Sequence, residues 1–103
     1  MKLAVQFEDE ADQEYRAAAR WYDERRAGLG VEFLDAVDDI LQRIVSLPSA
    51  GAPVPRLRAD LAVRRAPVMR FPYHIVYLKT EVAIRVLAVA HDRRKPGYWR
   101  SRV

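Results

Sequence analysis

LAVRRAPVMRFPYHIVYLKTEVAIRVLAVAHDRRKPGYW, residues 61–99, decides the fold of this chain. The stretch contains three apolar runs rich in β-branched residues, which predict strands at about 61–70, 73–79 and 82–90. Pro72 separates the first run from the second, and the polar residues 79–81 separate the second from the third. The last run is almost continuously apolar, which is typical of a central strand covered on both faces or nearly so.

Upstream of this stretch, the sequence predicts one strand and two helices. Apolar and polar residues alternate over residues 3–7, as in a short strand with one buried face. Asp9 is the expected N-cap of an amphipathic helix that runs to about Arg26. Residues 28–30, Gly-Leu-Gly, allow a tight reversal into a second amphipathic helix that ends before Pro48. Two helices with so short a connection form an antiparallel hairpin.

These elements define the expected fold class and domain organisation. Residues 48–58, PSAGAPVPRLR, contain three prolines and one glycine and are predicted to be a loop. The predicted order is therefore β-α-α-β-β-β, an α+β fold with an N-terminal helical hairpin packed on a small, mainly antiparallel four-stranded sheet. With 103 residues, we expect a single domain over residues 1–103.

Charge is distributed unevenly along the chain. Residues 1–50 contain 6 Lys and Arg against 11 Asp and Glu, a net charge of −5, whereas residues 51–103 contain 12 against 3, a net charge of +9. A basic half that also carries aromatic side chains is suited to bind a polyanion or an acidic peptide of a partner.

Composition excludes several classes of protein. The chain has no cysteine, so it has neither a disulfide scaffold nor a thiolate zinc site. Its two histidines stand 17 residues apart, at 74 and 91, and no glycine-rich phosphate loop is present, so we expect no metal and no cofactor. No apolar run approaches the roughly 18 residues of a membrane span. We therefore expect a cytoplasmic protein with no membrane partner.

The order of the elements and three sequence motifs resemble a known family. The motifs are WYDERRAGLGVEF in the helical part, FPYHIVY in the middle strand and VLAVAHDRRKPGYW at the end. Together they resemble the RelE/ParE superfamily of toxins from type II toxin–antitoxin systems, over essentially the whole chain. The resemblance implies a toxin that arrests growth unless its cognate antitoxin binds it in a hetero-oligomer. It also implies one of two targets, DNA gyrase or mRNA on the ribosome.

The resemblance assigns candidate catalytic residues only if the chain is a ribosome-dependent endonuclease. Cleavage at a 2′-hydroxyl needs a base, an acid and cations that stabilise the developing negative charge. The proton-transfer groups would be His91 or Tyr98, and the arginines would hold phosphate; the full candidate set is Arg65, His91, Arg93, Arg94 and Tyr98. His74 and Asp92 stand where such nucleases have arginine, which slightly favours the gyrase branch.

An antitoxin is expected to bind through an acidic amphipathic segment, because such a segment is attracted to the basic half. We also expect an apolar seam of the two helices to be exposed in the free protein. The candidate antitoxin contacts are Trp21, Leu29, Phe33, Leu57, Arg64 and Arg70.

Three further expectations concern single residues and the overall function. Arg64 and Arg65 are neighbours on a predicted strand, so at most one of them faces the site. Trp99 is expected to cover the open end of the sheet against the helices. A decayed toxin, or a basic nucleic-acid-binding module without catalysis, is the alternative to an active toxin.

Overall fold

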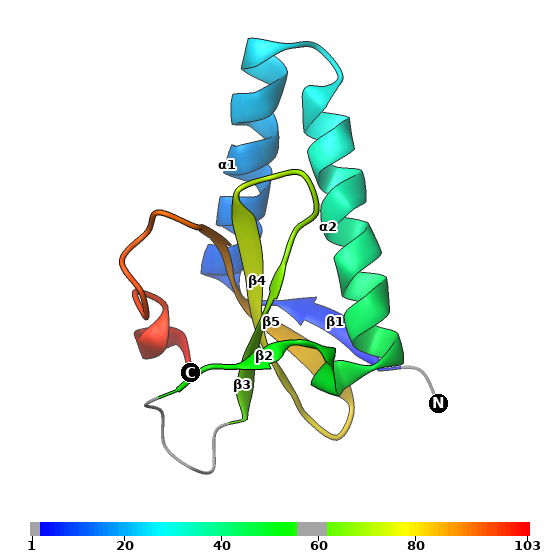
Figure 1. Cartoon of the computed structure of the whole chain (residues 1–103), viewed down its shortest axis with the longest axis vertical. Coiled ribbons are helices and arrows are strands. Elements are labelled where there is room, and N and C mark those ends of the chain that lie inside the picture. The colour runs from blue at the N-terminus through cyan, green and yellow to red at the C-terminus, as the bar shows by residue number, and fades with distance from the viewer. Residues whose placement is uncertain (1–2, 56–61) are drawn as a thin grey trace.

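The computed structural model describes residues 3–55 and 62–103, which form one five-stranded sheet and two long helices (Figure 1). The elements are β1 (Ala4–Phe7), α1 (Asp9–Arg25), α2 (Leu29–Ser46), the 3-10 helix η1 (Pro48–Ala50), β2 (Ala52–Pro53), β3 (Val63–Pro67), β4 (Tyr73–Lys79), β5 (Ala83–His91) and the 3-10 helix η2 (Arg100–Arg102). The strand order is β1-β5-β4-β3-β2, with β1 parallel to β5 and all other pairs antiparallel.

The predicted fold class is confirmed, and the strand count is corrected from four to five. The additional strand is β2, which lies in the segment predicted to be a loop. It is a two-residue edge strand in which Ala52 pairs with Arg65 and Pro53 with Arg64. A proline is compatible with an edge strand because its missing N–H need not bond to a neighbour.

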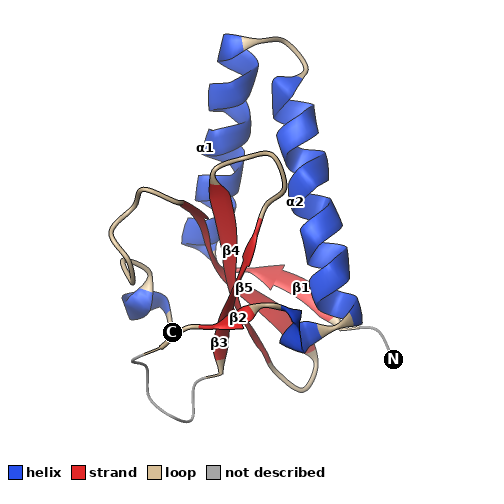
Figure 2. Cartoon of the chain, viewed as in Figure 1, coloured by secondary structure: helices blue, strands red, loops and turns tan. Residues whose placement is uncertain are grey.

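The two long helices form the predicted hairpin and lie side by side, extending past the sheet (Figure 2). Glu8 occupies the N-cap position of α1, so the helix begins one residue earlier than expected and Asp9 is its first residue. Gly28 has a φ of 89° at the start of α2. This left-handed conformation is the reason for a glycine in the turn.

One face of the sheet packs against both helices. Its core contains Phe33 and Ile44 of α2 together with Ile75 and Val89 of the sheet. The Phe33 ring is fully buried, with its centroid 5.2 Å from that of Phe71. Phe33, a candidate antitoxin contact, is therefore not exposed, because Phe71 in the turn between β3 and β4 places an aromatic ring over it.

The opposite face of the sheet has a smaller core centred on Trp99. This indole is 4% exposed and packs with Val76, Leu87 and Ala90. The expected position of Trp99, against the helices, is wrong: a turn at Gly97, whose φ is 78°, directs the C-terminal segment across the other face. Both faces of β5 are thus covered, as its continuous apolar sequence predicts.

A β-bulge interrupts the pairing of β4 with β5. Val76 is opposite Ala88 and Tyr77 is opposite Val86, which leaves Leu87 as an extra residue in β5. The bulge reverses which backbone groups of β5 face β4 beyond that point.

No helix in the described part of the chain is both long enough and apolar enough to cross a bilayer.

Candidate functional site

A basic cleft lies on the sheet face opposite the helices. It has a volume of about 420 Å³ and is formed by β3, β4, the end of β5 and the segment that follows it. Four cationic side chains line it, against a single carboxylate, Asp92; the cations are Arg65, Arg94, Lys95 and Arg100. The cleft is therefore suited to bind an anionic group or an acidic surface.

The cleft gathers four of the five candidate catalytic residues, namely Arg65, His91, Arg94 and Tyr98. Arg93 is exposed and is not part of the lining. Arg64 points to the other side of β3, where its guanidinium donates to the Gly51 carbonyl over 2.7 Å. Of these two neighbouring arginines, Arg65 lines the cleft and Arg64 does not.

The two histidines of the cleft have different partners. His74 Nδ1 lies 2.9 Å from Asp92 Oδ1, so the two residues that depart from the nuclease pattern bind each other. His91 Nδ1 accepts a hydrogen bond from the Arg93 backbone N–H over 3.1 Å. A neutral His91 therefore carries its proton on Nε2.

Tyr98 is held by a carboxylate on α1. Its hydroxyl donates to Glu14 Oε2 over 2.6 Å, and the Arg94 guanidinium lies 3.9 Å from the centre of its ring. Burial and the hydrogen bond to Glu14 raise the pKa of Tyr98 well above the usual range of a phenol. The hydroxyl is therefore protonated, and its proton is already donated to Glu14.

Glu14 has two further partners, which tie three separate parts of the chain together. It forms an ion pair with Arg102 over 2.9 Å, with side chains 17% and 13% exposed respectively. It also accepts the Val89 backbone N–H over 3.1 Å. Sequence reasoning missed Glu14, although a signal was available. It lies three residues after buried Ala11 and four before buried Ala18, which places it on the buried face of the helix.

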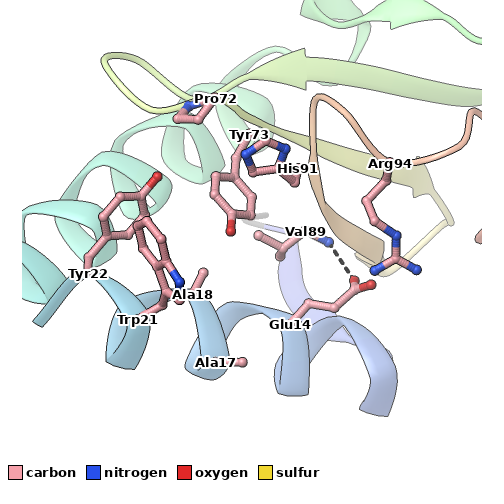
Figure 3. Close-up of a pocket in the computed structure, with 10 residues that line it drawn as sticks. All are labelled: Glu14, Ala17, Ala18, Trp21, Tyr22, Pro72, Tyr73, Val89, His91 and Arg94. Atoms are coloured by element: carbon pink, nitrogen blue, oxygen red, sulfur yellow. Dashed lines mark hydrogen bonds between the residues drawn. The ribbon is translucent and has the colours of Figure 1, made fainter. Parts of the chain in front are cut away.

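A second concavity, the α1–β5 groove, lies on the other side of His91 and has a volume of about 580 Å³ (Figure 3). Its lining is mainly apolar and aromatic, and it consists of Glu14, Ala17, Ala18, Trp21, Tyr22, Pro72, Tyr73, Val89, His91 and Arg94. Trp21 is 50% exposed, and the Arg25 guanidinium lies 3.6 Å from the centre of its ring. His91 and Arg94 line both concavities.

Comparison with known proteins identifies the family. A family model described as the ParE toxin of the type II toxin–antitoxin system parDE matches residues 5–96. The chain belongs to the ParE toxin family. Its structure is similar to a solved chain described as the chromosomal ParDE TA system from P. aeruginosa, with a TM-score of 0.59 and 19% identity. That match covers 87% of this chain and 96% of the other, and at this identity it supports the fold alone. No curated protein matches the sequence.

Membership of the ParE family implies an antitoxin partner. The residues predicted to contact the antitoxin lie on different elements. Trp21 lines the α1–β5 groove, and half-buried Leu29 begins α2. Arg70 has a φ of 70° in the turn between β3 and β4, with its guanidinium 3.8 Å from Glu32. Leu57 lies outside the described residues. Of these candidates, Trp21 lines the α1–β5 groove, whose volume is about 580 Å³.

Proposed function

We propose that this ParE-family chain arrests growth by binding DNA gyrase and does not cleave RNA. The observation that supports the proposal is the hydrogen bond from the Tyr98 hydroxyl to Glu14. A general acid must release its proton to the leaving oxygen near neutral pH. Burial and the Glu14 carboxylate both raise the pKa of Tyr98, which makes it a poor acid.

The remaining groups of the basic cleft supply an incomplete set for RNA cleavage. His91 contributes one imidazole to the cleft, whereas the imidazole of His74 is bound by Asp92. Cleavage at a 2′-hydroxyl needs both an acid and a base, and one histidine supplies one of these roles at a time. The cationic side chains need no such chemistry to attract an acidic surface of a protein target.

A ribosome-dependent mRNA endonuclease is the second candidate function. The specific observation in its favour is that Arg65, His91 and Arg94 line one cleft. In that mechanism the arginines would stabilise the charge on phosphate, and His91 would transfer the proton.

Two assays of the purified chain distinguish these functions. In the first, DNA gyrase relaxes or supercoils a plasmid in the presence of increasing amounts of the chain, and we expect supercoiling to be inhibited. In the second, a defined message is translated in a cell-free reaction and its 5′ ends are mapped by primer extension. We expect an intact message; cuts that appear only while ribosomes translate would overturn the proposal.

A conservative variant adds a test inside the cell. Tyr98→Phe removes the hydroxyl and keeps the ring that packs against Arg94. If no proton transfer is required, induction of this variant arrests growth as the parent chain does. Loss of growth arrest, with the variant still folded by circular dichroism, would favour the nuclease.

A further inference from the structure

The segment between β5 and η2 folds back in two consecutive turns. The Arg94 backbone N–H donates to the His91 carbonyl over 3.0 Å, and the Tyr98 backbone N–H donates to the Lys95 carbonyl over 3.2 Å. These turns bring residues 94 and 98 together, so that the Arg94 guanidinium lies over the Tyr98 ring, 3.9 Å from its centre. Both side chains line the basic cleft, and their contact is therefore part of its wall.

The Tyr98 ring is the fixed partner in this contact. It is half-buried and packs against the smaller core of the sheet, and its hydroxyl donates to Glu14 Oε2 over 2.6 Å. The Arg102 guanidinium lies 5.1 Å from the ring centre and is itself held by its ion pair with Glu14. Since α1, the sheet and η2 all contact it, the ring has little freedom to move.

The Arg94 side chain, in contrast, is exposed. Within residues 3–55 and 62–103, no carboxylate forms an ion pair with it. An exposed arginine samples many rotamers, and ordering them on binding costs free energy. The negative face of an aromatic ring attracts a guanidinium. The contact with Tyr98 therefore restricts the Arg94 side chain before any target binds.

We propose that Tyr98 is a positioning residue, whose ring holds the Arg94 guanidinium in the orientation in which it binds the target. The inference rests on the proposed function, in which the cations of the basic cleft attract an acidic surface of the target. It adds a pre-arranged cation to that function and gives Tyr98 a role that needs no proton transfer. Arg93 is the natural comparison, because it is exposed in the same segment and lies outside the cleft lining.

Two variants of Tyr98 separate the role of the ring from that of the hydroxyl. Tyr98→Phe removes the hydrogen bond to Glu14 and keeps the ring, whereas Tyr98→Leu removes both and keeps an apolar side chain. We expect the affinity for gyrase, measured by surface plasmon resonance, to change less than about 1.5-fold for Tyr98→Phe and to fall about threefold for Tyr98→Leu. Equal losses in the two variants, both folded by circular dichroism, would overturn the proposal.

A double-mutant cycle tests whether the ring acts through Arg94. In an Arg94→Ala background, Tyr98→Leu should lower the affinity for gyrase less than about 1.5-fold, because the guanidinium that the ring positions is gone. In an Arg93→Ala background, Tyr98→Leu should still lower the affinity about threefold. The same threefold loss in both backgrounds would overturn the proposal, since it would show that the ring acts independently of Arg94.

A nuclear magnetic resonance measurement on the free chain needs no target and serves also if Tyr98→Leu does not fold. A guanidinium over the ring face places the Arg94 side-chain protons in the ring current. We expect these protons to resonate upfield of their random-coil positions in the parent chain and in Tyr98→Phe. Random-coil positions in the parent chain would overturn the positioning even if gyrase binds. Upfield shifts in a chain that does not bind gyrase would overturn the proposed function and leave the contact between the ring and Arg94 intact.

Discussion

The basic cleft and the α1–β5 groove share His91 and Arg94, yet they present opposite kinds of surface. The cleft is a charged surface over a buried indole, Trp99. The groove is mainly apolar and has a half-exposed indole, Trp21. The difference shows that one short segment after β5 separates a charged surface from a mainly apolar one.

The largest expected effect is a difference in the free energy of unfolding between variants of the two indoles, Trp99 and Trp21. Trp99→Ala removes a buried ring from the smaller core and should lower the free energy of unfolding by about 4 kcal/mol. Trp21→Ala removes a half-exposed ring and should cost about 1 kcal/mol or less. Urea unfolding of both variants measures the contrast. Similar losses of unfolding free energy in the two variants would contradict the contrast between a buried indole in the cleft and a half-exposed indole in the groove.

The next largest loss of stability is expected for Glu14→Ala. The Glu14 carboxylate bonds Tyr98 of the cleft, the Arg102 side chain and the Val89 backbone in the groove. The variant leaves the Arg102 charge without its partner in a site that is mostly buried, at a cost of about 3 kcal/mol. Asp12→Ala is the matched control on the same helix, since it breaks an exposed pair with Arg16 worth less than about 0.5 kcal/mol. Chemical denaturation distinguishes them, and a Glu14→Ala midpoint equal to that of the control would contradict the role of Glu14.

A smaller difference is expected between two neighbouring arginines. Arg94→Ala changes the lining of both concavities, whereas Arg93→Ala changes an exposed side chain outside the cleft lining. If gyrase is the target, as proposed above, its affinity for the chain, measured by surface plasmon resonance, should fall about fivefold for Arg94→Ala and less than twofold for Arg93→Ala. An equal loss in both variants would indicate that the target contacts the whole basic segment and not the cleft.

The smallest effect concerns stability in alkali. The pKa of Tyr98 is higher in the folded chain than the value of about 10 expected for the unfolded chain. As the pH rises, the unfolded chain therefore loses this proton first, so the contribution of Tyr98 to stability is constant well below pH 10 and falls as the pH rises above it. Tyr98→Phe should reduce that fall by less than about 1 kcal/mol at pH 11. Thermal unfolding between pH 8 and pH 11 measures it, and identical slopes for parent and variant would contradict the prediction.

Much of the fold was predictable from local patterns. β4 occupies the predicted residues 73–79, and β5 begins one residue later and ends one residue later than the predicted 82–90. β2 was missed because a segment rich in proline and glycine has the composition of a loop, and its pairing depends on the neighbouring strand β3. Four candidate residues lie in one cleft because of their positions on strands and near strand ends. They are Arg65, His91, Arg94 and Tyr98.

The sequence by itself determined the order of elements, the helical hairpin, the buried central strand and the location of positive charge, because these depend on residues a few positions apart. Tertiary structure alone decided the partner of Tyr98, which is Glu14, 84 residues away. It also decided which face Trp99 covers and that β1 pairs with β5 as far as Val86. These features depend on the relative lengths of β1 and β5, on the bulge at Leu87 and on the return of the C-terminal segment. No periodicity within one segment encodes such long-range packing, so only the assembled fold reveals it.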